Sequence, residues 1–130
     1  MIIMASDEQQ SKKLYNSQFA LFVKNQFGSK TMDYVRKLTT REVGNVKNKK
    51  VLFAGCGDGV ECISIAQSAQ VTGVDISDKC IEAAKKNCPK ATFFVSDFEK
   101  TMLPSKSFDV IVSMFAVMYK KDLVPVLKEF

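Results

Sequence analysis

Residues 51–60 have the sequence VLFAGCGDGV, in which an apolar run is followed by Gly55, Gly57 and Gly59 at every second position. This pattern predicts a buried strand, a tight turn and the start of a helix. Glycines let the backbone turn sharply and let a ligand approach the main chain. The unpaired N–H groups of the following helix would point at that ligand. We therefore expect a ligand site at the turn, although a tight turn with nothing bound would also explain the glycines.

The spacing of the glycines restricts the ligand. A dinucleotide fingerprint has the pattern GxGxxG, and counting from Gly55 places Val60 where its third glycine belongs. NAD and FAD are therefore disfavoured. The phosphate-binding pattern GxxxxGK[ST] is absent from the sequence, so hydrolysis of a nucleoside triphosphate has no support.

Asp75 stands at the end of the next apolar run, residues 71–75. An acid at the tip of the strand beside the glycine turn can accept two hydrogen bonds from a ribose diol. Asp75 could instead cap the next helix, a role for which Ser77 and Asp78 compete. With the glycine turn beside it, ribose binding is the favoured role.

The rest of the chain alternates short apolar runs with helical patterns. Strands that alternate with helices pair in parallel through right-handed crossovers, so the sequence predicts a three-layer α/β domain. Before this part, apolar positions three and four residues apart predict two amphipathic helices separated near Gly28-Ser29. Asp122 is expected to cap a last helix. The expected strands are 51–54, 71–75, 91–95 and 108–113, and the helices between them are 60–69 and 78–87, the latter stopped by Pro89.

The composition is that of one ordinary soluble domain, with 130 residues, 46% hydrophobic and 25% charged. The longest apolar stretch, residues 110–119, is well short of the roughly 20 residues of a membrane-spanning helix. The first eight residues lack the cationic segment of a secretory signal. We expect an intracellular, cytoplasmic protein with no membrane partner.

The residue types exclude several kinds of chemistry. The chain has no histidine, which removes Ser-His and Cys-His nucleophile pairs. Its cysteines form no CxxC pair, so we expect reduced thiols and no metal site. The net charge of +5 and the lysine run at residues 47–50 are the only support for an RNA-binding protein. A solvated loop explains the run better, because no aromatic residue interleaves with it, and nucleic acid is not an expected partner. The cysteines are Cys56, Cys62, Cys80 and Cys88.

Three further segments follow the glycine turn: residues 71–77 (VTGVDIS), residues 96–98 (SDF) with Leu103-Pro104, and residues 107–113 (SFDVIVS). In order and spacing, residues 50–130 resemble the class I S-adenosylmethionine-dependent methyltransferases. The resemblance implies a Rossmann-like α/β fold, a three-layer sandwich with parallel strand order 3-2-1-4. It implies that residues 46–130 form the N-terminal half of the cofactor-binding domain, with the sheet incomplete at its C-terminal side. Residues 1–45 would be an N-terminal helical lid or cap segment.

The resemblance also assigns cofactor-binding roles by position. The glycine turn would pass under the methionyl part of S-adenosylmethionine. Asp75 would hold the ribose hydroxyls, and Ile76 would lie against the adenine. The turn residues in this assignment are Ala54, Gly55, Cys56, Gly57 and Gly59.

Four later residues complete the assignment. Asp97 would accept from the exocyclic amine of the adenine, and Phe98 would flank the ring. Asp97 as a loop cap and Phe98 as a core residue remain open alternatives. Ser113 and Met114, at the tip of the fourth strand, would border the reactive methyl group.

The chain departs from the family pattern at Phe53, where many members carry an acid that orients the methionyl amine. Glu61 could compensate, as in the thiopurine-methyltransferase-like branch, or it could be an acid favoured by the helix dipole. Tyr15 and Phe19 could face the cofactor as lid residues, but their spacing of four also fits packing. No catalytic residue is identified, because the task of the protein is to align acceptor and methyl group.

The acceptor branch is restricted by residues 113–116, SMFA, which differ from the N-P-P-Y and D-P-P-Y types used on exocyclic or amide nitrogens. The stretch 97–118 resembles the small-molecule members of the ubiquinone and menaquinone biosynthesis type. We therefore expect methyl transfer to a small-molecule acceptor. The alternative is a truncated, non-catalytic or partner-dependent module that docks through its open sheet edge. If the chain stops at Phe130, residues 108–113 leave unpaired backbone at the margin of the sheet, so self-association or a partner chain is expected at this edge.

Overall fold

The computed structural model describes residues 8–26, 29–117 and 120–130. Outside the described residues lie 1–7, 27–28 and 118–119. These include the start of the expected segment 1–45, the Gly28 of the expected helix break and the end of the apolar run 110–119.

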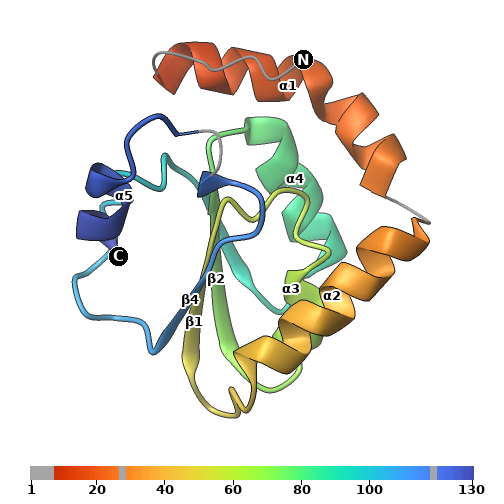
Figure 1. The fold of residues 1–130 in the computed structure, drawn as a ribbon, viewed down its shortest axis with the longest axis vertical. Coiled ribbons are helices and arrows are strands. Elements are labelled where there is room, and N and C mark those ends of the chain that lie inside the picture. The colour runs from red at the N-terminus through yellow and green to blue at the C-terminus, as the bar shows by residue number, and fades with distance from the viewer. Residues whose placement is uncertain (1–7, 27–28, 118–119) are drawn as a thin grey trace.

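A four-stranded parallel sheet forms the centre of the fold (Figure 1). The strand order β3-β2-β1-β4 confirms the order 3-2-1-4 that the resemblance implied. Val51 pairs with Val71 on one side and with Val110 on the other, so the strands run in register across the sheet. The carboxyl ends of the strands therefore meet at one end of the sheet. The strands are β1 (Lys50–Ala54), β2 (Gln70–Asp75), β3 (Thr92–Val95) and β4 (Val110–Val112).

Helices lie on both sides of this sheet, as a three-layer domain requires. In Figure 1, α2, α3 and α4 lie on one side of the strands and α5 on the other, while α1 crosses above the carboxyl ends. The helices are α1 (Glu8–Gln26), α2 (Lys30–Val43), α3 (Cys62–Ile65), α4 (Asp78–Asn87) and α5 (Val124–Glu129). Within the described residues, no helix is long and apolar enough to cross a membrane.

The core lies between the sheet and the helices α3 and α4. Four consecutive residues of β1, from Val51 to Ala54, are buried, because both faces of a central parallel strand are covered. Ile81 and Ala84 of α4 pack in the same buried cluster as Phe93 of β3. The four cysteines are buried free thiols, which agrees with the expectation of reduced cysteines.

Helix α1 is attached to the start of α4 by polar contacts. The Ser77 hydroxyl caps α4 by accepting from the Cys80 N–H at 3.2 Å, and it donates to Asn16 Oδ1 of α1 at 2.5 Å. Lys12 of α1 forms an ion pair with Asp78 at 2.9 Å. Since Ser77 lies two residues after β2, these contacts place α1 beside the residues that end that strand.

Two expected elements are shorter, by more than one residue, than the sequence predicted. The helix expected over residues 60–69 is reduced to α3, because turns replace it where the Ser68 and Ala69 N–H groups both donate to the Ile65 carbonyl. Just before β2, the Ser68 carbonyl instead accepts a hydrogen bond from the Asn48 N–H at 2.8 Å. The strand expected over residues 108–113 is reduced to β4. Ser29 caps α2, which confirms the helix boundary expected near this residue.

Candidate functional site

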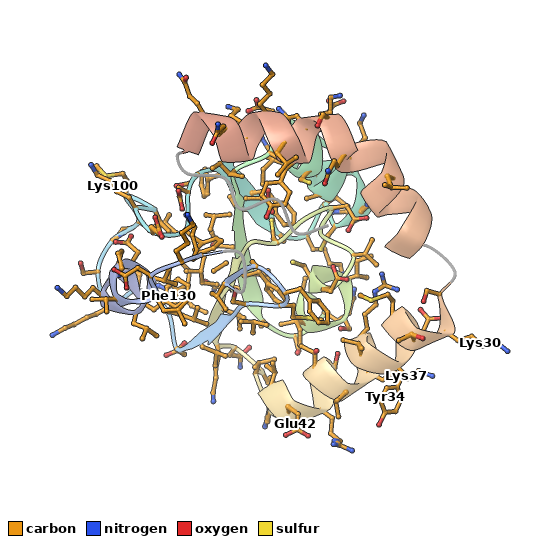
Figure 2. All side chains as sticks on the ribbon, turned by 45° about the horizontal axis from the view of Figure 1, so that its top comes forward. Lys30, Tyr34, Lys37, Glu42, Lys100 and Phe130 are labelled. Carbon is orange, nitrogen blue, oxygen red and sulfur yellow. The ribbon has the colours of Figure 1, made fainter. Side chains whose placement is uncertain are left out.

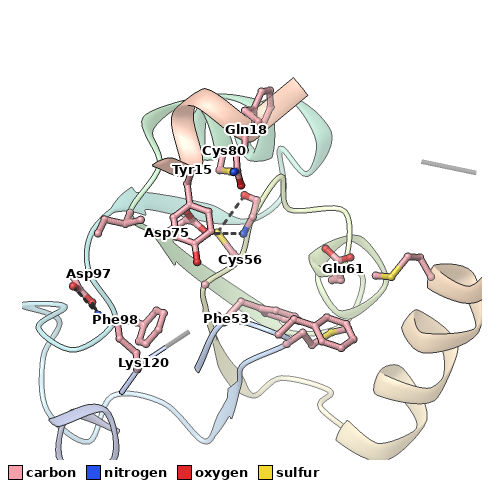
Figure 3. Close-up of a pocket in the computed structure, with 18 residues that line it drawn as sticks. Tyr15, Gln18, Phe53, Cys56, Glu61, Asp75, Cys80, Asp97, Phe98 and Lys120 are labelled. Carbon is pink, nitrogen blue, oxygen red and sulfur yellow. Dashed lines mark hydrogen bonds and ion pairs between the residues drawn. The ribbon is translucent and has the colours of Figure 1, made fainter. Parts of the chain in front are cut away.

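A cavity of about 510 Å³ lies at the carboxyl ends of the strands (Figure 3). Its walls come from the glycine turn after β1, the residues that follow β2, β3 and β4, and the helices α1 and α2. In open parallel sheets, ligands bind at this end, where crossovers leave to opposite sides. The volume falls in the range of small-molecule and cofactor sites. The cavity is therefore the candidate site.

The glycine turn owes its shape to three left-handed backbones, with φ of 75° at Gly55, 54° at Gly57 and 75° at Gly59. A Cβ on Gly55 would collide with the Ala116 side chain, and one on Gly59 would lie 2.8 Å from the Ala84 Cβ. These two glycines are therefore required by packing within the domain. Gly57 lines the cavity and presents its backbone to it.

Asp75 is held against this turn through its carboxylate. Oδ2 accepts from the Gly57 N–H at 3.0 Å, and Oδ1 accepts from the Ser77 N–H at 2.9 Å. Burial raises the pKa of Asp75 above its ordinary value, although these backbone N–H groups act in the opposite direction. Both oxygens thus accept backbone hydrogen bonds, and the carboxylate also lines the cavity, where it can accept from a ligand. The orientation of the carboxylate is therefore set before any ligand arrives.

Glu61 lies at the opposite side of the glycine turn from Asp75 and also lines the cavity (Figure 3). Its Oε1 accepts from Arg36 Nε of α2 at 3.3 Å. Burial raises the pKa of Glu61, and the neighbouring Asp58 carboxylate acts in the same direction. Asp58 is itself buried, and its Oδ2 has no hydrogen-bond partner among the described residues. The Arg36 guanidinium therefore pairs with Glu61 at the cavity, and its charge also acts against the rise in the pKa of the buried Asp58.

Asp97 and Phe98 lie at another end of the cavity, together with a residue that the sequence did not single out (Figure 3). Lys120 Nζ lies 3.3 Å from Asp97 Oδ1 and 3.2 Å from Oδ2. It also lies 5.1 Å from the centre of the Phe98 ring. Asp97 Oδ1 accepts from the Glu99 N–H at 2.9 Å, which is the loop-cap role left open from the sequence. The polar and aromatic groups expected to contact adenine are therefore contacted by a lysine in this structure.

A family model for the methyltransferase domain matches residues 51–130. The chain belongs to this methyltransferase domain family. The matched residues contain the glycine turn, Asp75, Asp97 and β4. The match therefore includes the strands of the sheet and most of the cavity.

Curated relatives and solved structures agree with this assignment. The methyltransferase domain is 34% identical over 79 residues to release factor glutamine methyltransferase of Flavobacterium psychrophilum, covering 55% of this chain and 28% of that protein. It is 37% identical over 89 residues to ubiquinone biosynthesis O-methyltransferase of Pelagibacter ubique, covering 65% and 37%. The chain spans about a third of the length of the curated relatives it matches. Magnesium protoporphyrin IX methyltransferase of Synechocystis PCC 6803, solved with bound SAH, has the same fold, with a TM-score of 0.75, 21% identity and coverage of 95% and 66%.

Most of the residues expected at the cofactor meet at the cavity of the methyltransferase domain. Ala54, Gly59 and Ser113 are not among its lining residues. Ser113 Oγ donates to the Ala54 carbonyl at 2.9 Å, which ties β4 to β1 just below the cavity. The expected residues that line the cavity are Tyr15, Phe19, Gly55, Cys56, Gly57, Asp75, Ile76, Asp97, Phe98 and Met114.

Sequence reasoning missed two cations of the site, Lys120 and Arg36. Each one bonds to a carboxylate more than twenty residues away along the chain. Local sequence patterns therefore predict neither contact. Cys56 was expected at the site and lines it, but burial raises the pKa of its thiol well above the ordinary value. This thiol is therefore a neutral wall of the cavity.

Proposed function

We propose that the methyltransferase domain binds S-adenosylmethionine in this cavity and transfers its methyl group to a small molecule. The observation that carries the proposal is the bond from Gly57 N–H to Asp75 Oδ2, which fixes a carboxylate at the bend of a left-handed glycine turn. A ribose diol has two O–H donors, and a carboxylate at the end of this strand is a suitable acceptor for them. Gly55, Cys56 and Gly57 would lie along the methionyl part, and Ile76 would lie against the adenine.

The cavity fits this cofactor in the chemistry of its walls. Carboxylates stand at separate places around it, at Asp75, Asp97 and Glu61, while Phe53 and Met114 supply apolar surface between them. When bound, the cofactor supplies a sulfonium that already activates its methyl group. The chain has only to orient the acceptor and exclude water, which requires no histidine.

Glu61 is the residue we propose for the methionyl ammonium. Phe53 stands where many members of the family carry an acid, and it leaves that group without a charge partner on β1. Glu61 lines the cavity with one oxygen on Arg36, and the second buried carboxyl group, Asp58, adds negative charge beside it. A cationic group of a ligand would complement this excess of negative charge.

The proposed acceptor is a small apolar or aromatic molecule. The N-terminal helices form one wall of the cavity. Its large apolar and aromatic side chains are Tyr15 and Phe19 of α1 and Met32 of α2. A wall of this kind suits an uncharged aromatic acceptor. We propose that residues 1–45 act as a lid or cap over the cofactor domain 46–130. The ubiquinone O-methyltransferase among the relatives is consistent with this class of acceptor.

Calorimetric titration of the 130-residue chain with S-adenosylhomocysteine (SAH) tests the proposal. We expect micromolar binding to the wild type and a loss of at least about tenfold in Asp75→Ala, since the carboxylate would hold two ribose hydroxyls. Glu82→Gln, which changes an exposed carboxylate on the outer face of α4, should bind like the wild type. A folded wild-type chain that gives no heat, or an Asp75→Ala variant with unchanged affinity, would contradict the proposal.

We further propose a cytoplasmic location and self-association of the isolated chain through β4. The buried free thiols support a reducing compartment. Among the described residues, β4 pairs only with β1 and stands at one margin of the sheet. Unpaired backbone at such a margin is a template for another chain.

A further inference from the structure

The side chain of Lys120 enters the cavity from the segment between β4 and α5 (Figure 3). Its ammonium lies 3.2 Å and 3.3 Å from the two oxygens of Asp97 and 3.1 Å from Glu99 Oε2. The side chain is only 22% exposed, and those of Asp97 and Glu99 are 14% and 29% exposed. This lysine is therefore part of the cavity wall and not a solvated surface group.

The ammonium has no donor left for a ligand in this arrangement. A lysine has three N–H donors, and three carboxylate oxygens lie within reach of them. Its position over Phe98, 5.1 Å from the ring centre, also covers the aromatic face on that side. Lys120 thus contacts both groups that the proposed function assigns to adenine, which are the Asp97 carboxylate and the Phe98 ring.

Adenine and Lys120 therefore compete for the same surface. The amine of adenine is neutral, so it replaces an ammonium at Asp97 only if the charge of Asp97 remains compensated elsewhere or is exposed to water. Lys120 has a flexible four-carbon stem, and Glu99 is the more exposed of its two partners. The ammonium can leave Asp97 while remaining near Glu99.

We propose that Lys120 is an internal competitor that fills the adenine end of the cavity and must leave Asp97 before the cofactor binds. The inference rests on the proposed function, because it concerns the adenine of that cofactor. When only a fraction of molecules is competent to bind, the apparent dissociation constant rises by the inverse of that fraction. Lys120 accordingly lowers the affinity for any ligand that carries adenine.

The test compares Lys120→Met with the wild type in calorimetric titrations of the 130-residue chain. Methionine keeps an unbranched apolar stem and removes the charge. We expect SAH to bind about fivefold or more tightly to Lys120→Met, and adenosine to gain by a similar factor. S-ribosylhomocysteine, which lacks the adenine, should show no gain. Lys121→Met, at the exposed neighbouring position, is the matched control and should bind like the wild type.

A second variant keeps the inference testable if Lys120→Met does not fold. Glu99→Gln leaves the Glu99 N–H bond to Asp97 in place and removes one of the two carboxylates that hold the ammonium. In Glu99→Gln the ammonium of Lys120 has Asp97 as its remaining carboxylate, so a larger fraction of molecules has Lys120 at Asp97. The effect on binding is therefore opposite to that of Lys120→Met. SAH should therefore bind more weakly to Glu99→Gln than to the wild type.

The outcomes separate this inference from the proposed function. If the wild type binds SAH and Lys120→Met binds it equally or more weakly, Lys120 is not a competitor and only this inference fails. An equal gain for S-ribosylhomocysteine would also overturn it, because the effect would not concern adenine. If the folded wild type and both variants bind neither SAH nor adenosine, the proposed function and this inference fail together.

Discussion

Gly59 and Gly44 share a left-handed backbone but differ in what surrounds them. Their φ angles are 75° and 71°, yet a Cβ on Gly59 would lie 2.9 Å from the Ala84 Cα, while one on Gly44 meets no atom of the described residues within 4 Å. Alanine at Gly44 costs only backbone strain, about 1–3 kcal/mol, because φ of 71° with ψ of −149° is a conformation that glycine adopts almost alone. Gly59→Ala must also displace α4, so we expect a loss of about 3 kcal/mol or more. Urea unfolding of the two variants measures the difference, and equal losses would show that the contact with α4 carries no cost.

Asp58 gives a prediction for the pH dependence of stability. Burial raises the pKa of its carboxyl group, and within the part of the chain that the structure describes its Oδ2 has no hydrogen-bond partner. A raised pKa means that the folded state holds this proton more tightly than the unfolded state. Asp58 therefore contributes favourably to stability at pH values below the pKa of the unfolded state, about 3.9. This contribution is lost as the pH rises through the pKa of the folded state.

The variant Asp58→Asn removes this titration. The free energy of unfolding of Asp58→Asn, relative to the wild type, should rise as the pH increases from about 4 to 7. Denaturant unfolding at several pH values measures this difference. Glu82→Gln removes an exposed carboxyl whose pKa is lowered by its hydrogen bond from Lys86, so this variant should show the opposite trend. A difference for Asp58→Asn that stays constant with pH would show that Asp58 does not titrate abnormally.

Helix α1 depends on its attachment to the start of α4. Asn16→Ala removes the oxygen that accepts the hydrogen bond from the Ser77 hydroxyl. Ser77 is buried, so its O–H donor would be left without a partner. We expect a loss of about 1–2 kcal/mol in unfolding free energy and faster hydrogen exchange in α1. Ser17→Ala is the control, because Ser17 bonds to the Leu14 carbonyl within the same helix and lies on an exposed side. If exchange in α1 responds equally to both changes, Asn16 does not fix the helix.

The elements themselves follow largely from local patterns in the sequence. The expected helix 78–87 has the bounds of α4, because Ser77 caps one end and Pro89 follows the other. The helix after the glycine turn was overestimated, because its periodicity continues into turns that feed β2. Asp75 could be placed from its position at the end of a strand. Lys120 could not, because its contact with Asp97 spans 23 residues and depends on how a later segment folds back.

Several large apolar side chains are exposed on the side of the protein that carries β4 and α5. Leu127 of α5 is 69% exposed, and Val124 is 53% exposed. Figure 2 shows Phe130, which is 37% exposed, at the same side of the molecule. Together with the margin of β4, which pairs with no further strand among residues 8–26, 29–117 and 120–130, this surface is what the proposed self-association would cover.

The side of β4 that faces away from β1 carries the backbone N–H of Val110. The Asp109 N–H donates to the Lys50 carbonyl on the β1 side, and successive N–H groups of a strand point to alternate sides. The Val110 N–H therefore points away from β1, and Val110→Pro removes a donor from the open margin without removing a bond to β1. Light scattering should show concentration-dependent dimers of the wild-type 130-residue chain and a shift of at least about tenfold toward monomer in Val110→Pro. Val110→Ile keeps the N–H and should associate like the wild type. A wild-type chain that stays monomeric at high concentration would show that the β4 margin does not pair with a second copy.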